Sequence, residues 1–222
     1  SPDGSVVEKG GVAQLLRTRF ATTQVARKVY TCSGGCLSSG SAIKDYPFNT
    51  TTIDPAAAAN QTAFGTADAA ELTNLITWMR GQDNAVDENM DGVLTDMRAR
   101  VHGDVLHSRP AVVNYNRTGD DNDVMIFYGS NDGTFRAVIG GKGTYGGQEA
   151  WAFVAEEFYS KLKVLRDNNT RRSATTPKPM FMDGSIATYE YDANKDGKLV
   201  SSDGAIHKHR FWCGCRTSSV IV

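Results

Sequence analysis

Residues 192–203 place oxygen-bearing side chains at alternate positions and then turn sharply. Carboxylate and amide oxygens are the ligands that calcium prefers, and alternate residues converge on one ion only where the backbone wraps around it. Gly197 suits the turn that completes the wrap, and Leu199 suits the apolar position that anchors such a loop to the fold. The predicted calcium ligands are Asp192, Asn194, Asp196, the carbonyl oxygen of Lys198, and Asp203. The alternative is a solvated turn without an ion.

Residues 87–96 repeat this opening but not its ending. Arg98 stands at the twelfth position, where a cationic side chain cannot bind a cation, so a shorter loop would have to close on Thr95 or Asp96. The predicted ligands of this second calcium site are Asp87, Asn89, Asp91 and Thr95. An acidic turn is the alternative interpretation.

Four cysteines fall in two close pairs. Cys32 and Cys36 are separated by three residues, two of them glycine, so the backbone is free to bring the sulfur atoms to bonding distance and we predict a disulfide. Cys213 and Cys215 would lie on one face of a strand and are poor partners for each other. The alternative is a zinc site built from Cys32, Cys36, Cys213 and Cys215, or including His207 and His209.

His102, Asp104 and His107 lie close together in the sequence and could form an acid–base set. No serine or cysteine nucleophile motif accompanies them, and a polar segment that leads into a strand often fixes packing through hydrogen bonds. We therefore favour a structural role for these residues. We predict no catalytic residues, and the chain is not expected to be an enzyme.

The composition is that of a globular chain with nearly balanced charge. The 222 residues include 24 Lys and Arg against 25 Asp and Glu, for a formal net charge of −1, and 40% hydrophobic residues suffice for a core. The lack of a basic block argues against nucleic acid as a partner. No apolar run is long enough for a membrane helix, and residues 1–4 lack the features of a signal peptide, so an export signal is expected to have been removed or to lie upstream.

The hydrophobic pattern predicts a few helices and several short strands. Helices are expected over residues 11–17, 69–80 and 156–166, the second of them capped by Asp68 and Glu71. Strands are expected over residues 25–30, 111–115, 124–128, 134–139 and 151–154, and a bent strand pair over residues 180–191. Residues 32–65 show little periodicity and are expected to form a long surface excursion.

The four strands between residues 111 and 154 should form one antiparallel meander, because Asn131, Asp132 and Gly133 supply a tight turn between the middle pair. A four-stranded meander of this length is one blade of a β-propeller.

Five segments resemble those of a known family. They are residues 80–83 (RGQD), 102–110 (HGDVLHSRP), 128–133 (YGSNDG), 149–153 (EAWAF) and 182–185 (MDGS). In order and approximate spacing they resemble the C-terminal propeller region of PilY-type type IV pilus proteins, over about residues 1–204. The resemblance implies a secreted factor at the pilus tip or the outer membrane that supports pilus assembly, adhesion and twitching motility under the control of calcium. The partners it implies are pilin or minor pilins and a host or abiotic surface.

The predicted fold is mainly β with a few helices: a partial β-propeller of about one full four-stranded blade and part of another. A closed propeller needs about four to eight blades, so we expect the chain to be a fragment. Residues 1–108 would form a mixed segment with the long loop, an amphipathic helix and the first acidic loop, and residues 109–222 the propeller-like region. Residues 207–222 do not resemble the family, as a divergent end or a shifted reading frame would explain.

Two other functions stay open. Quinoprotein dehydrogenases use similar propellers with calcium beside a quinone, but they need a nearly complete propeller and a pair of adjacent cysteines, which this sequence lacks. A calcium-stabilised structural module without an adhesive role is the other alternative.

Overall fold

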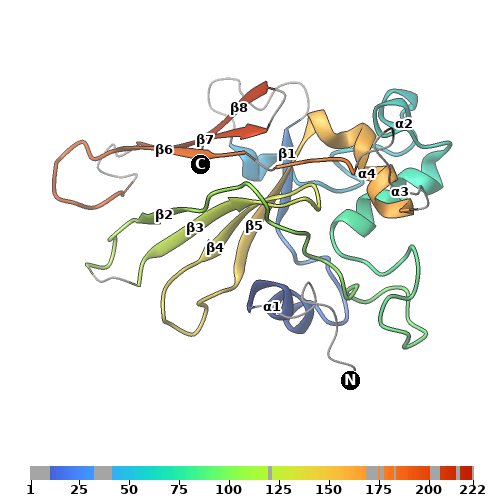
Figure 1. Cartoon of the computed structure of the whole chain (residues 1–222), viewed down its shortest axis with the longest axis horizontal. Helices are drawn as coiled ribbons and strands as arrows, with labels where there is room; N and C mark the ends of the chain where they lie inside the picture. Colours follow the sequence, from blue (N-terminus) through green and yellow to red (C-terminus); the bar gives the residue numbers. More distant parts are fainter. Residues whose placement is uncertain are drawn as a thin grey trace.

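The computed structural model describes residues 11–32, 42–119, 122–168, 175, 178–182, 184–200, 206–213 and 216–221, the last two ranges by their backbone alone. These residues form a five-stranded sheet, a three-stranded sheet and a few helices (Figure 1). The prediction of a mainly β chain with some helices is confirmed. In the described part of the chain, no helix combines the length and the apolar character needed to cross a membrane.

The larger sheet has the strand order β1-β5-β4-β3-β2. Its strands are β1 (Val29–Cys32), β2 (Ala111–Asn114), β3 (Val124–Gly129), β4 (Phe135–Ile139) and β5 (Glu149–Ala155). Strands β2 to β5 form the antiparallel meander that the sequence predicts. Strand β1 adds to β5 in parallel, with Val29 opposite Ala152, so residues on both sides of position 108 share one sheet.

The turn between β3 and β4 is the tight one expected from its glycine. The backbone N–H of Ser130 donates to the carbonyl of Thr134 at 3.0 Å. Gly133 has a φ of 91°, a left-handed conformation that side chains with a Cβ rarely adopt. The local sequence therefore fixes this turn, as it does in other hairpins.

Three helices pack together beside β1 (Figure 1). They are α2 (Ala58–Phe64), α3 (Ala69–Met79) and α4 (Tyr159–Asp167), and the short 3-10 helix η2 (Glu156–Phe158) runs directly into α4. Helix α3 begins where the sequence predicts, because the Asp68 carboxylate accepts a hydrogen bond from the Glu71 N–H at 2.8 Å. Its helically spaced apolar residues Leu72, Leu75, Ile76 and Met79 are buried.

The main core lies between these helices and the sheet. The ring of Tyr159 stacks on that of Phe64 with a centroid distance of 4.1 Å, and Phe48 packs against both. The prediction of a surface excursion over residues 32–65 is therefore wrong for its second half: Phe48, Ile53 and Phe64 are buried, and the segment forms the 3-10 helix η1 (Ile43–Asp45) and α2. Apolar residues that do not recur at the spacing of a helix or a strand can still lie in the core when a neighbouring helix covers them.

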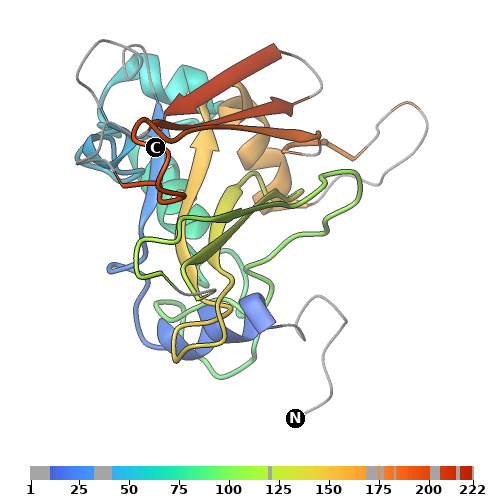
Figure 2. The same cartoon turned by 90° about the vertical axis from the view of Figure 1, so that its left-hand side faces the viewer.

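Helix α1 (Gly11–Arg19) lies apart from the other helices, near the start of β5 (Figure 2). Its residue Leu16 joins Phe20, Met97 and Val101 in a second, smaller core. The Arg19 guanidinium donates to the carbonyl of Glu149 at 3.1 Å, which attaches this helix to the first residue of β5.

The smaller sheet contains β6 (Ile186–Tyr191), β7 (Ile206–Cys213) and β8 (Arg216–Ile221) in antiparallel order. A strand pair within residues 180–191 was expected, and this expectation is wrong. Residues 178–182 form no strand, and β6 takes its partner from β7 further along the chain.

Gly129 offers a direct test of the packing between β3 and the segment around Met182. A Cβ atom at position 129 would lie 1.9 Å from the carbonyl oxygen of Met182. Because this oxygen belongs to the backbone, the clash can be relieved only if the main chain moves. We expect Gly129→Ala to lower the free energy of unfolding by about 1–3 kcal/mol, as overpacking does. The control is Gly143→Ala, because no atom lies within 4 Å of a Cβ at position 143. Equal denaturation midpoints for the two variants would contradict this packing.

Candidate metal centres

The loop at residues 87–93 is organised by its own acidic side chains. The Asp87 carboxylate accepts hydrogen bonds from the N–H of Asp91 at 3.2 Å and of Gly92 at 2.7 Å. The Asp91 carboxylate in turn accepts from the N–H of Val93 at 2.8 Å. Met90 and Gly92 take left-handed φ values of 59° and 83°, so the backbone turns back around the two carboxylates.

The loop at residues 192–198 has similar internal bonding. The Asp192 carboxylate accepts from the N–H of Lys195 and from that of Gly197, both at 2.7 Å. The Asp196 carboxylate accepts from the N–H of Lys198 at 2.9 Å. Lys195 and Gly197 have φ values of 59° and 78°, nearly those of the corresponding residues of the first loop.

The two loops therefore share most of their internal hydrogen bonds and differ in one, because Asp87 also accepts from the fifth residue whereas Asp192 also accepts from the fourth. In each, the first residue accepts from the sixth, the fifth accepts from the seventh, and the fourth and sixth residues are left-handed. The third residue of each loop is an asparagine whose Oδ1 accepts from the N–H of the fifth. This geometry follows from the shared residue types, because short acidic and amide side chains bond readily to backbone N–H groups two positions on.

The acidic side chains of both loops bond to backbone N–H groups of their own loop. Across the described residues, the structure contains no group of three His, Cys, Asp or Glu side chains placed to hold a metal ion. An ion would have to bring the oxygens inward from these positions, which is a side-chain adjustment on a backbone that is already folded.

At the end of the first loop, the structure places Asp96 rather than Thr95 beside the predicted ligands. Asp96 is buried, and its Oδ2 accepts a hydrogen bond from the Asn89 side-chain amide at 2.9 Å. Its Oδ1 is buried without a hydrogen-bond partner, whereas Thr95 is exposed. A buried carboxylate oxygen without a donor carries a desolvation penalty that a cation would relieve.

A further acid, Asp83, lies behind the first loop; the sequence analysis includes it in the segment 80–83 but not among the predicted metal ligands. It is only 1% exposed, its carboxylate accepts from the N–H of Glu88 at 2.8 Å, and its own N–H donates to the carbonyl of Asp96. Burial raises the pKa of Asp83 to about 6, and the neighbouring charges of Glu88, Asp96 and Asp87 add to this effect. The first loop therefore encloses more negative charge than its own ligand pattern shows.

The second loop is attached to the end of β2. The Leu199 N–H donates to the carbonyl of Tyr115 at 2.9 Å, and the Asn116 side-chain amide donates to the carbonyl of Gly197 at 3.1 Å. Leu199 also packs against the main core, as an anchoring apolar residue should. The predicted closing ligand Asp203 lies outside the described residues, so the closure of this loop stays a prediction.

Cys32 is disulfide-bonded, which leaves no thiolate at this position for a zinc ion. Its predicted partner Cys36 lies outside the described residues, so the pairing itself stays a prediction. The side chains of the other residues considered for zinc, Cys213, Cys215, His207 and His209, lie outside the described part as well.

A network of buried charges joins the sheet to the segments around it. The Arg27 guanidinium forms two hydrogen bonds with the Glu149 carboxylate, at 2.7 and 3.0 Å. Arg136, which is fully buried, lies 3.5 Å from Glu149 and pairs with Asp132 on its other side. Burial opposes the ionisation of both acids, but Arg136 lowers the pKa of Asp132, and Arg27 with Arg136 lowers the pKa of Glu149.

Two of the three residues considered for acid–base chemistry, His102 and Asp104, bond beside this network. One ring nitrogen of His102 bonds to the carbonyl of Gly103 and the other to the Tyr128 hydroxyl, at 2.7 and 2.8 Å. Asp104 accepts from the Asn131 side chain at 3.0 Å and forms an ion pair with Lys178. His102 thus bonds to Tyr128 in β3, and Asp104 bonds to Asn131 in the β3–β4 turn and to Lys178. These contacts support the structural role that the sequence favours.

The five segments singled out in the sequence meet at this network. Arg80 donates to the carbonyl of Arg27, the Ser108 hydroxyl accepts from the Gly129 N–H, and the Asp132 carboxylate accepts from the Gly103 N–H. Glu149 and Met182 complete the set, the former through Arg27 and the latter by its close packing on Gly129. Residues far apart in the sequence are thus held in one cluster of contacts.

Comparisons with known proteins add no relative: no family model, no curated protein and no solved structure matches this chain.

The raised pKa of Asp83 predicts a pH-dependent stability. In calcium-free buffer the folded protein holds this proton up to about pH 6, whereas the unfolded chain loses it near pH 4, so stability falls as the pH rises through that window. We expect Asp83→Asn to stabilise the fold by about 1–3 kcal/mol at pH 7.5 and to have little effect at pH 4. Asp45→Asn serves as the control, because Asp45 is exposed. Chemical denaturation at the two pH values measures the difference, and an equal effect of Asp83→Asn at both would contradict the burial of a charged Asp83.

Proposed function

We propose that this chain is a calcium-binding part of a type IV pilus biogenesis and tip adhesion factor of the PilY type, and that it catalyses no reaction. The observation that carries the proposal is a set of three backbone-to-side-chain hydrogen bonds that the two acidic loops share: the first residue accepts from the sixth, the third from the fifth and the fifth from the seventh. The residue types that produce this pattern in both loops are also hard oxygen donors, at the first, third and fifth positions. Two loops that share it, both rich in hard oxygen donors, favour a common ligand.

The donor set fits calcium better than a transition metal. Carboxylate, amide and carbonyl oxygens line both loops, and neither sequence contains a cysteine or a histidine. In the first loop Asp87, Asn89, Asp91 and Asp96 would hold the ion, with Thr95 as the ligand that the sequence alone suggests. In the second loop Asp192, Asn194, Asp196, the Lys198 carbonyl and Asp203 would hold it.

A bound calcium ion supplies positive charge that holds acidic groups together. The residues of the chain hold the loops in shape. Asp87 and Asp192 fix the turn of each loop by accepting a hydrogen bond from its glycine N–H, and Leu199 anchors the second loop to the core. Binding would select the ordered form of each loop and stabilise it in proportion to the ion affinity. The result would be a surface whose local order depends on extracellular calcium.

The family proposal is supported by the order and spacing of the five resembling segments, which also lie together around the buried charge network. The antiparallel meander β2 to β5 supports the further proposal that it is one blade of a β-propeller, with the smaller sheet as part of another. Its partners would then be pilin or minor pilins and a host or abiotic surface, outside the cell at the pilus tip or the outer membrane.

Calorimetry tests the two calcium loops. We expect the parent chain to bind two calcium ions, Asp91→Ala and Asp196→Ala to weaken one site each by about tenfold or more, and the double variant to weaken both, because a carboxylate ligand is lost in each case. Asp45→Asn is the control, since it removes an exposed carboxylate that belongs to neither loop. Unchanged calcium binding in both single variants would contradict the proposal.

The role in pili is tested in a piliated bacterium. We expect replacement of Asp192 and Asp196 by Asn in the intact pilus factor to alter surface piliation or twitching while secretion continues. Normal pili and motility in a variant that no longer binds calcium would overturn the regulatory role. Absorbance from a bound quinone together with turnover would favour a quinoprotein-like enzyme instead.

A further inference from the structure

The side-chain amide of Asn89 lies between two carboxylates of the first acidic loop. Its Nδ2 donates a hydrogen bond to Oδ2 of Asp91 at 3.1 Å and another to Oδ2 of Asp96 at 2.9 Å. Two carboxylate oxygens thus converge on one place, which the partly positive hydrogens of an amide now fill. A calcium ion at this place would replace those hydrogens, and Asn89 would turn its own oxygen toward the ion.

Asp96 supplies a second observation that points to a cation. The residue is only 9% exposed, and its Oδ1 is buried without a hydrogen-bond partner while its Oδ2 bonds to Asn89 in the loop. A buried carboxylate oxygen without a donor carries a desolvation penalty. Calcium takes six to eight oxygen ligands and accepts carboxylates through both oxygens, so an ion bound by Asp96 would use the unpaired oxygen as well.

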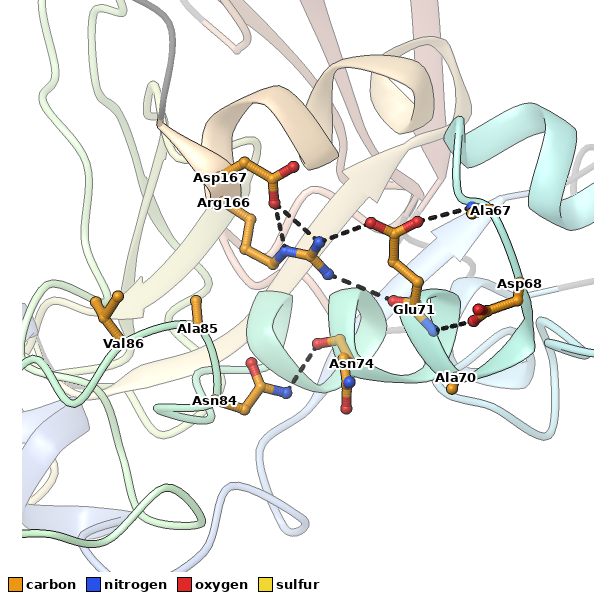
Figure 3. Close-up of a pocket in the computed structure, with 10 residues that line it drawn as sticks. All are labelled: Ala67, Asp68, Ala70, Glu71, Asn74, Asn84, Ala85, Val86, Arg166 and Asp167. Carbon is orange, nitrogen blue, oxygen red and sulfur yellow. Dashed lines mark hydrogen bonds and ion pairs between the residues drawn. The ribbon is translucent and has the colours of Figure 1, made fainter.

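The backbone around this site is fixed before an ion binds. The N–H of Asp83 donates to the carbonyl of Asp96 at 3.0 Å, which holds the two ends of the loop together. The side-chain amide of Asn84 donates to the carbonyl of Asn74 at 2.9 Å and to the Thr77 hydroxyl at 2.8 Å. Figure 3 shows the first of these bonds, which ties the segment entering the loop to α3. A closing carboxylate on a fixed base loses less freedom on binding, and rigidity of this kind raises calcium affinity.

The two loops also differ in charge. Over seven corresponding positions, residues 87–93 contain three acidic residues and no basic one, whereas residues 192–198 contain two acidic residues and two lysines. Lys195 and Lys198 occupy the positions at which the first loop has Met90 and Val93. The predicted closing acids add one negative charge to each loop, and the buried Asp83 adds another to the first. The number of charged ligands and neighbours sets calcium affinity, so the second loop should bind more weakly.

We propose that the first loop is the tighter of the two calcium sites, closed by both carboxylate oxygens of Asp96, and that the second loop is the one that responds to calcium. The inference rests on the proposed function, because it requires that both loops bind the ion. When the calcium concentration falls, the second loop empties while the first stays filled. The response is then exerted at the end of β2, where Tyr115 and Asn116 hold the second loop.

The test is a titration of the isotope-labelled chain at buffered calcium concentrations, followed by NMR. Gly92 and Gly197 are matched reporters, because each donates its N–H to the first carboxylate of its own loop at 2.7 Å. We expect the Gly92 amide signal to reach its midpoint at a calcium concentration at least tenfold below that of Gly197. Asp96→Asn should raise the Gly92 midpoint by tenfold or more and leave that of Gly197 unchanged, which also shows that the variant is folded.

Thr95→Val is the matched control, because it removes the neighbouring oxygen donor, and it should change neither midpoint. A second variant tests the charge argument: Lys195→Met combined with Lys198→Val gives the second loop the residues of the first and should lower the Gly197 midpoint by threefold or more.

Equal midpoints for the two glycines, a lower midpoint for Gly197, or a larger effect of Thr95→Val than of Asp96→Asn would overturn this inference and leave calcium binding itself intact. The absence of a calcium-dependent shift at both glycines would instead overturn the proposed function, and this inference with it.

Discussion

The paired charges of Arg27 and Glu149 are the interaction on which the rest of the fold depends. Both side chains are almost fully buried, and Glu149 also neutralises Arg136, which has no exposed surface. Removing charges from water is costly, and a buried pair that loses one member leaves the other unpaired, at a cost of about 3–5 kcal/mol. The network therefore favours an arrangement of its chain segments in which each of these buried charges keeps a partner.

The need to keep these buried charges paired positions segments whose relative placement backbone hydrogen bonds alone do not determine. Arg27 precedes β1, Glu149 begins β5, and Arg136 lies in β4, so satisfying their charges sets the relative placement of the three strands. Asp132 carries the network into the β3–β4 turn and from there to Gly103. The polar segment that approaches β2 is thus held by charge-assisted hydrogen bonds, which are about twice as strong as neutral ones.

The first acidic loop begins and ends at two short segments that are hydrogen-bonded to each other, residues 81–82 and 97–98, which we call the neck of the loop. Gln82 and Met97 form an antiparallel bridge, and the N–H of Arg98 donates to the carbonyl of Gly81 at 2.8 Å. Arg98 is itself buried and lies over the Trp78 ring at 4.1 Å, where burial lowers its pKa to about 10. Arg98, which the sequence shows only as a residue unable to bind a cation, closes the neck of the loop instead.

The elements that could be predicted from the sequence are those whose causes are local. Helix α3 carries its cap and its apolar period within twelve residues, and the β3–β4 turn carries its glycine. Helix α2 could not be predicted, because its one deeply buried residue, Phe64, is covered by Tyr159 from another helix. The burial of Arg136 and Asp83 was equally hidden, since charged residues are exposed unless a distant partner or fold position encloses them.

A comparison of the two acidic loops distinguishes the effect of the local sequence from that of the surrounding fold. They share residue types at the first, third, fifth and sixth positions, and they fold alike although one leaves the neck beside Trp78 and the other leaves β6. Their settings differ: the first encloses the buried acids Asp83 and Asp96, whereas the second carries Lys195 and Lys198 within its own turn. The local sequence thus decides the shape of each loop, and the surrounding fold decides how much negative charge that shape must hold.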